Sequence, residues 1–258
     1  MLKKSSLFLL FSIPLLAKNP FFQPLPFKEA IIEYNLSGTQ KGFQTLYIKN
    51  YGRYRVYYKN LKTNFLNKNK KKESYIIETP KWVYSLNPDK TALRTPNFKY
   101  LLYIRYKDLS KQDQKQVLKN LKLLNFLPIK DTRFKIAKNF TKINDISCDL
   151  LLQKAKRECY GYKGSLLLKS KIKFLGFNST KLLYNIFETK TDPKLYDLSD
   201  IKIKDDKLKS VQLYELSAKI INLLKRKLNP KNIFINVKEK DKDVNEIIQE
   251  GIKSLQDI

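Results

Sequence analysis

Apolar and polar side chains alternate over most of residues 30–189, which is the pattern of β-strands that bury one face. In the first such stretch Ile32, Tyr34 and Leu36 share a face, because successive side chains of a strand point to opposite sides. Clusters of Gly, Pro, Asn and Lys separate the stretches, as turns separate strands. We therefore expect an antiparallel sheet of about ten strands, the later ones at residues 43–48, 54–58, 75–79, 82–86, 98–106, 146–153, 157–162, 166–174 and 182–187.

Three segments depart from this alternation. The lysine-rich stretch 67–72 predicts a solvated loop. At residues 110–125 we expect an amphipathic helix lying on the sheet, with Ser110 as its N-cap and Asp113 in its first turn. Its apolar stripe is Val117, Leu118, Leu121 and Leu124. A second helical stripe begins after Ile203 and stops at Pro230, and it consists of Val211, Tyr214, Ala218, Ile221, Leu224 and Leu228.

The C-terminal tail differs in charge from the body. Residues 229–258 contain five Lys against six Asp or Glu, whereas the rest of the chain is strongly basic. A brief apolar run at 233–237 precedes an amphipathic segment in which Val244, Ile247, Ile248, Ile252 and Leu255 align. The tail therefore suits docking on the basic body of the same molecule or on a partner, and both alternatives stay open.

The N-terminus has the features of a secretory signal. Lys3 and Lys4 precede an apolar run at residues 7–16, and the small residue Ala17 follows it. The run is too short to cross a hydrocarbon core about 30 Å thick as a helix, and Pro14 interrupts it. We expect a signal peptide at 1–17, a sheet domain at 18–203 and a helical extension at 204–258. The mature protein would be periplasmic and without a transmembrane segment; a retained anchor is the alternative.

The formal net charge is +28, with 52 basic and 24 acidic residues. A surface of this sign favours anionic neighbours such as lipopolysaccharide, acidic lipid or nucleic acid. Nucleic acid ranks last among these partners, because stacking on single strands needs exposed aromatic rings and burial explains most rings of this chain. Only seven of the basic residues are Arg, the side chain that binds phosphate in bidentate fashion. The abundance of Lys, Asn, Ile, Tyr and Phe is also typical of an AT-rich genome, which offers a non-functional explanation of the charge.

Side chains that commonly carry catalysis are scarce. The chain has no histidine, the usual general base and metal ligand near neutral pH. It has no Gly-rich phosphate loop and no Gly-x-Ser-x-Gly motif. The carboxylate pairs at 205–206 and 241–243 lie in charge-dense, solvated stretches. We expect a protein that is not an enzyme and needs neither a cofactor nor a metal.

The two cysteines predict a structural disulfide. Cys148 and Cys159 flank a hairpin whose turn falls near Gln153 and Lys154, which would place the two residues directly opposite each other. An exported chain with an even number of cysteines usually joins them. Closing so short a loop would stabilise the fold by about 3 kcal/mol.

A family resemblance rests on the residues around these cysteines. The run 158–170, Glu-Cys-Tyr-Gly-Tyr-Lys-Gly-Ser-Leu-Leu-Leu-Lys-Ser, follows Cys148-Asp149-Leu150 and resembles a motif of exported, largely uncharacterised bacterial proteins. Residues 31–38, Gly42, residues 45–47 and 51–52, and residues 109–114 resemble the same group, which is similar in architecture to the periplasmic lipoprotein-localisation-factor (LolA-like) family. The resemblance covers about residues 31–203 and has no counterpart for the later helical extension.

This resemblance implies an α+β fold in which a strongly bent antiparallel sheet, an incomplete barrel, is covered by helices. It also implies a cavity for a lipid or another apolar ligand such as an acyl chain, although no lipid-binding residue carries over individually. Alternating rows of the strands could line that cavity or simply pack against the helices. The residues in these rows are Tyr34, Leu36, Trp82, Tyr84, Tyr100, Leu102, Ile172 and Phe174. The two functions left open are a binding or carrier protein and a basic adaptor on an anionic envelope surface or a protein partner.

Overall fold

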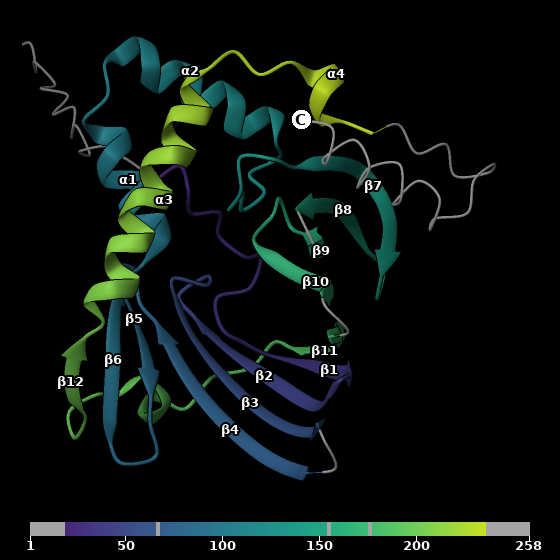
Figure 1. Cartoon of the computed structure of the whole chain (residues 1–258), viewed down its shortest axis with the longest axis vertical. Helices are drawn as coiled ribbons and strands as arrows, with labels where there is room; N and C mark the ends of the chain where they lie inside the picture. The colour runs from purple at the N-terminus through teal and green to yellow at the C-terminus, as the bar shows by residue number, and fades with distance from the viewer. Residues whose placement is uncertain (1–18, 66–67, 154–155, 175–176, 236–258) are drawn as a thin grey trace, which may run out of the picture.

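The computed structural model describes residues 19–65, 68–153, 156–174 and 177–235 (Figure 1). The expected signal peptide and the amphipathic stretch 244–255 lie outside these residues. The described chain is mixed α+β, with twelve strands in one open sheet whose order is β12-β6-β5-β4-β3-β2-β1-β11-β10-β9-β8-β7. The strands are β1 (Ala30–Gly38), β2 (Gln40–Lys49), β3 (Tyr54–Phe65), β4 (Lys68–Glu78), β5 (Trp82–Leu86), β6 (Thr91–Pro96), β7 (Lys135–Ile143), β8 (Ile146–Gln153), β9 (Lys156–Gly161), β10 (Leu166–Phe174), β11 (Phe177–Phe187) and β12 (Lys202–Asp205).

The expectation of a mainly antiparallel sheet is confirmed, but the described sheet has twelve strands rather than the expected ten or so. All neighbouring strands pair antiparallel except β12 and β6, which are parallel. The sequence pattern missed β6, β7 and β12. β12 is four residues long and fully exposed, so it has no alternation of burial that a sequence could reveal. It also spans the boundary that we expected between residues 203 and 204.

The lysine-rich stretch is not a loop, and that prediction is wrong. β4 begins at Lys68 and pairs with β3 in continuous register from Phe65 opposite Lys68 to Arg55 opposite Glu78. The ladder of a hairpin is made by backbone N–H and C=O groups, so a polar sequence can extend it beyond the core.

Residues 98–106 form a helix, so the predicted strand there is also wrong. α1 (Phe98–Lys107) starts where the side chain of Asn97 accepts a hydrogen bond from the backbone N–H of Lys99, 3.0 Å away. Leu101 and Leu102 are both buried, which a helix permits for adjacent residues and a half-buried strand does not. Because the stretch is apolar at nearly every position, its sequence fits either period.

The other predicted helices are confirmed in position. In α2 (Lys111–Leu123) the hydroxyl of Ser110 accepts from the backbone N–H of Asp113, as expected of its N-cap. α3 (Lys207–Lys225) buries Ile221 and Leu224 of its predicted stripe, but Val211 and Tyr214 near its start are exposed. The short elements η1 (Pro193–Tyr196) and α4 (Pro230–Ile233) complete the fold.

The three long helices lie together on one side of the sheet (Figure 1). Leu102 of α1, Leu121 of α2 and Leu224 of α3 share a buried cluster with Leu151 of β8 and Tyr160 of β9. Among the described helices, none combines the length and apolar character that crossing a membrane would require. We call the face of β1–β4 that carries Tyr34 the inner face, because Tyr34 lines a cavity between the sheet and the helices.

Cys148 and Cys159 form the predicted disulfide between β8 and β9. Their Cα atoms are 5.4 Å apart, but Cys159 stands opposite Leu150 in the ladder, so the cysteines are diagonal rather than directly opposed. The pairing follows from where the hairpin turns: Gln153 pairs with Lys156, so the turn lies further along the chain than we expected. Both cysteines are buried, in a cluster with Leu166 and Leu168 of β10.

We expect the double variant Cys148→Ala/Cys159→Ala to lose about 3 kcal/mol of unfolding free energy, because its unfolded chain is no longer restrained by the closed loop. Urea unfolding followed by circular dichroism measures the loss. Dithiothreitol should destabilise the natural protein by a similar amount and leave the double variant unchanged. Equal stability of the oxidised protein and the double variant would show that the bridge contributes nothing.

Candidate functional site

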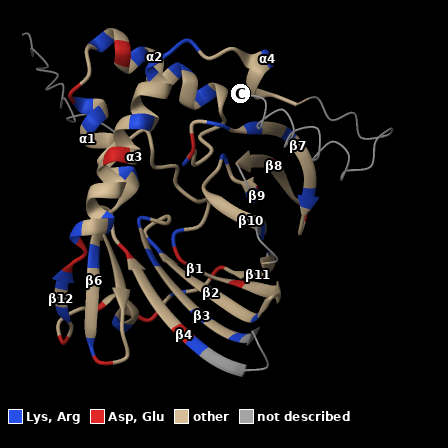
Figure 2. Ribbon diagram, in the orientation of Figure 1, with Lys and Arg blue, Asp and Glu red and all other residues tan. Residues whose placement is uncertain are grey.

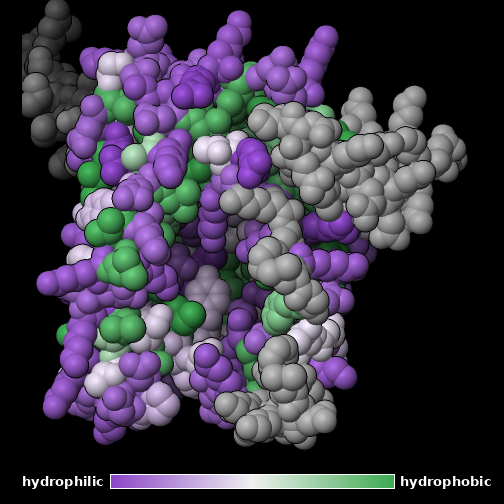
Figure 3. All heavy atoms as spheres, viewed as in Figure 1, coloured by the Kyte–Doolittle hydropathy of each residue, from purple (hydrophilic) through white to green (hydrophobic). Residues whose placement is uncertain are grey.

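A cavity separates the inner face of the sheet from the helices. Its volume is about 420 Å³, within the roughly 300–1,000 Å³ typical of small-molecule sites. Apolar side chains from all three long helices and from β2 and β10 line it, including Leu46, Phe98, Leu102, Leu121, Leu167, Ile220 and Leu224. In the space-filling view the surface is hollowed between the helical layer and the strands (Figure 3). The cavity therefore offers apolar walls to a ligand.

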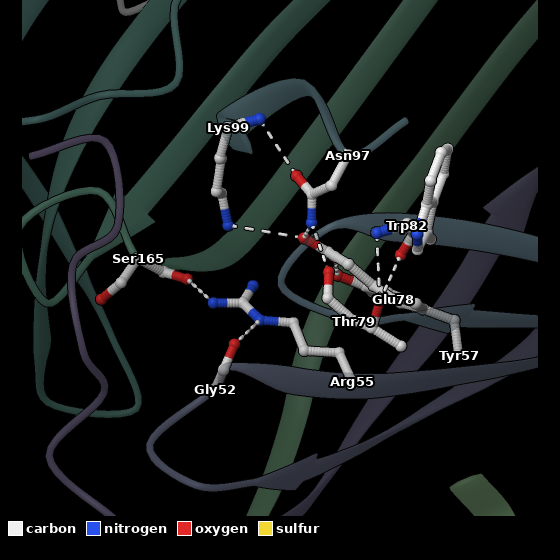
Figure 4. Close-up of polar contacts among 9 residues, drawn as sticks. All are labelled: Gly52, Arg55, Tyr57, Glu78, Thr79, Trp82, Asn97, Lys99 and Ser165. Carbon is white, nitrogen blue, oxygen red and sulfur yellow. Dashed lines mark hydrogen bonds and ion pairs between the residues drawn. The ribbon is translucent and has the colours of Figure 1, made fainter. Parts of the chain in front are cut away.

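Charged side chains also line this cavity, and apart from Lys130 they belong to two groups. The first, which we call the Glu78 cluster, consists of Arg55, Tyr57, Glu78, Asn97 and Lys99 (Figure 4). Glu78 accepts hydrogen bonds from the Tyr57 hydroxyl at 3.0 Å and the Asn97 amide at 3.1 Å, and Lys99 Nζ lies 3.7 Å from its Oε1. Arg55 donates to the backbone oxygens of Gly52 and Ser165, at 2.9 and 3.3 Å. The cations of this cluster thus have partners within the protein.

The Glu78 carboxylate is the electrostatic centre of this group. Burial raises the pKa of Glu78, but the charges of Lys99 and Arg55 and the hydrogen bonds from Tyr57 and Asn97 outweigh it and hold the pKa at about 2. Burial and the nearby Arg55 lower the pKa of Lys99 to about 8, although Glu78 partly offsets them. The cluster is therefore ionised near neutral pH: Glu78 offsets one of its two positive charges, and the other cation, Arg55, donates to two backbone oxygens.

The second group, which we call the Lys181 cluster, consists of three cavity residues, Lys156, Glu158 and Lys181, and of Lys59, which does not line the cavity but whose charge acts on Lys181. Lys156 Nζ lies 2.5 Å from Oε1 of the buried Glu158. Lys181 Nζ lies 4.0 Å from the ring centroid of Tyr34, whose hydroxyl donates to the Leu167 carbonyl at 2.9 Å. Three lysines thus surround one carboxylate, which leaves this end of the cavity with excess positive charge.

Burial and the neighbouring Lys59 lower the pKa of Lys181 to about 7, and Glu158 offsets only part of this effect. The pKa of Lys59 is itself lowered by burial and by Lys72. Both amines are thus held in surroundings that disfavour their charge.

Of the residues predicted to bind an apolar ligand, the structure brings Tyr34 and Leu102 to the cavity. Leu36 is buried further along β1, opposite Lys181. Trp82 lies under the guanidinium of Arg94, 4.4 Å from ring centroid to Cζ, and is not a cavity residue. The remaining predicted residues are outside the cavity lining: Tyr84 lies in a separate buried cluster, Tyr100 and Ile172 are partly buried in α1 and β10, and the side chain of Phe174 is not described.

The charged cavity residues were missed because the apolar residues of each strand are expected on its buried face and the polar residues on its exposed face. One signal was present: Arg55 alternates with Tyr54 and Val56, and Glu78 ends the strand that follows, opposite Arg55 in the ladder. Opposite charges that meet across a hairpin on its buried face indicate an internal group of interacting charges. Among the described residues, no three His, Cys, Asp or Glu side chains gather in a way that could hold a metal ion.

Comparison with known proteins does not assign a family. No family model matches the chain, and no curated protein matches it. Two solved structures show weak similarity: the crystal structure of an uncharacterized conserved protein from Thermus thermophilus (7% identity, TM-score 0.38, 70% of this chain and 91% of that one) and a structure of PNGF-II (10% identity, TM-score 0.39, 73% of this chain and 33% of that one). The chain thus spans about a third of the PNGF-II chain, and similarity at this level supports no functional argument.

Proposed function

We propose that this protein is a non-enzymatic binding or carrier protein that holds an apolar ligand, such as an acyl chain, in the cavity between sheet and helices. The observation that carries this proposal is a cavity of about 420 Å³ whose walls include apolar side chains from α1, α2, α3, β2 and β10. A close-packed interior normally leaves few voids larger than a water molecule. A volume of this size, left open by elements that otherwise pack closely, suits a ligand.

The proposed location is the periplasm. It is supported by the N-terminal signal pattern and by the disulfide, since disulfides persist mainly in oxidising compartments. The mostly antiparallel, open sheet with helices on one side is compatible with the proposed kinship to the LolA-like proteins and with their bent, incomplete barrel. An exported carrier of this type would move or shield a lipid in the envelope.

The high positive charge favours a second function, that of a basic adaptor on an anionic surface such as lipopolysaccharide or acidic lipid. Lys and Arg are distributed over the helices and most strands rather than gathered on one side (Figure 2). Such a distribution gives the whole surface a positive potential but defines no single binding patch. The carrier function therefore ranks first.

Filling the cavity tests the carrier proposal. In Leu167→Trp a partly buried wall residue becomes larger, and we expect the variant to bind decanol at least about tenfold more weakly than the natural protein, because the indole occupies the ligand's space. Leu182→Trp is the matched control, since Leu182 is 39% exposed and does not line the cavity. Both delipidated variants are compared by isothermal titration calorimetry.

Mass spectrometry of the protein purified from the envelope complements this measurement by identifying co-extracted lipid. Unchanged decanol affinity in Leu167→Trp would contradict the carrier proposal. Salt-sensitive binding to anionic vesicles that Leu167→Trp leaves intact would instead favour the adaptor.

A further inference from the structure

The two charged groups of the cavity differ in how far their charges are compensated. In the Glu78 cluster, Arg55 has two backbone acceptors and Lys99 has a carboxylate at 3.7 Å. In the Lys181 cluster, the single carboxylate, Glu158, already pairs with Lys156. Within the described parts of the chain, no hydrogen bond or ion pair joins Lys59 or Lys181 to another side chain. The amines that have neither a hydrogen bond nor an ion pair therefore lie at the Lys181 end.

A buried amide next to these lysines also lacks a partner. Gln44 is 4% exposed, and its Nε2 has no hydrogen-bond acceptor among the described residues. In the sheet Gln44 pairs with Tyr34 on one side and with Lys59 on the other, so the three side chains form one row across β1, β2 and β3 on the inner face. Buried donors are almost always satisfied, so an orphan between Lys59 and the Tyr34 ring over which Lys181 lies indicates a missing acceptor.

We propose that the ligand of the cavity is an anionic amphiphile, whose acidic head group binds between Lys181, Lys59 and Gln44 while its chain lies among the apolar walls. This inference rests on the proposed function and adds the chemical class of the ligand. A carboxylate or phosphate supplies oxygens that accept from both amines and from the orphan amide, and charge-assisted hydrogen bonds of this kind are the strong ones. Tyr34, which lines the cavity beneath Lys181, connects this site to the apolar walls.

The protonation of Lys181 gives the site a characteristic pH dependence. The groups facing Lys181 are Tyr34 on β1, Lys59 on β3, and Lys156 and Glu158 on β9. With a pKa of about 7, Lys181 is largely neutral above that pH in the free protein. A bound anion favours the ammonium form, so binding above pH 7 takes up a proton. Affinity for a carboxylate should then fall as the pH rises from 7 to 9, by up to about tenfold per unit.

Three ligands with the same chain test the inference: decanoate, decyl phosphate and decanol. We expect the natural protein to bind the better of the two anions at least about tenfold more tightly than decanol. Lys181→Met should remove most of this preference and leave decanol affinity nearly unchanged. Gln44→Leu, which keeps the charges and removes the orphan amide, should weaken anion binding several-fold. Lys169→Met is the control, because Lys169 is exposed on β10 and does not line the cavity.

Calorimetry of decanoate at pH 7 to 9, in buffers of different ionisation enthalpy, measures proton uptake. Uptake by the natural protein that disappears in Lys181→Met supports the inference. A preference for decyl phosphate supports a phosphate head group, and a preference for decanoate supports a fatty acid. Equal affinity for decanol and both anions overturns the inference and leaves the carrier proposal intact. Failure of all three ligands to bind overturns both.

Discussion

Glu78→Ala should lower the free energy of unfolding by about 3 kcal/mol, because it leaves Arg55 and Lys99 inside the protein without their carboxylate. The same change removes the acceptor for the Tyr57 hydroxyl and the Asn97 amide. Urea unfolding at pH 7 measures the loss. As a control, Glu188→Ala removes an exposed carboxylate and should change the stability by less than about 0.5 kcal/mol. Equal values for the two variants would mean that the cluster does not stabilise the fold.

The pH dependence of the same carboxylate provides a second measurement. The pKa of Glu78 is about 2 in the folded protein, against an ordinary value of 4.5 for the unfolded chain. A depressed carboxyl pKa stabilises the fold at pH values above the unfolded pKa, and this stabilisation is lost as the pH falls from 4.5 through 2. Between pH 4.5 and 2, the free energy of unfolding of the natural protein should therefore fall by about 3 kcal/mol more than that of Glu78→Gln. If the unfolding free energies of the two proteins fall equally with pH, the low pKa of Glu78 is contradicted.

Asn120→Ala should lower the free energy of unfolding by about 2–3 kcal/mol, because the Asn120 amide joins two helices that cover the cavity. Its Nδ2 donates to the backbone oxygens of Leu224 and Arg226, both at 2.7 Å, and the side chain is 2% exposed. The last carbonyls of a helix have no partner within that helix, so removing the amide leaves these two unsatisfied at the end of α3. Urea unfolding measures the cost.

Asn222→Ala is the matched control, since Asn222 is exposed on α3 and should tolerate the change within about 0.5 kcal/mol. Hydrogen exchange adds a local measurement: α3 should exchange faster in Asn120→Ala, because its end is less firmly attached to α2. Equal exchange and equal stability in the two variants would show that the amide does not hold the helices together.

Features that depend on a few neighbouring residues could be predicted from sequence. The N-cap at Ser110 is local to one turn of chain, and the structure confirms it. The alternation of β1 is confirmed as well, because Ile32, Tyr34 and Leu36 are all buried. The disulfide was predictable because the chain has only two cysteines, but the register of its hairpin was not, since residues on either side of Gln153 could form the turn.

Most residues of the candidate site could not be predicted from the sequence. Tyr34 and Leu102 were predicted from alternation, yet Leu102 belongs to a helix rather than the expected strand. The decisive charged residues come from strands far apart in the chain: Lys181 of β11 lies over Tyr34 of β1, and Arg55 of β3 donates to the Ser165 carbonyl. No local pattern distinguishes these side chains from the many surface lysines and arginines.

The sequence by itself determined most strands, the mainly antiparallel pairing, the capped helix α2 and the partnership of the two cysteines, because each follows from periodicity or from residues a few positions apart. Only the tertiary structure decided that the helices leave a cavity against the sheet, and which cations within it have counter-ions. Both depend on side chains brought together from distant parts of the chain, such as Asn120 with Leu224 or Tyr34 with Lys181. Burial and charge compensation are properties of that assembly, and they distinguish the few cavity lysines from the many on the surface.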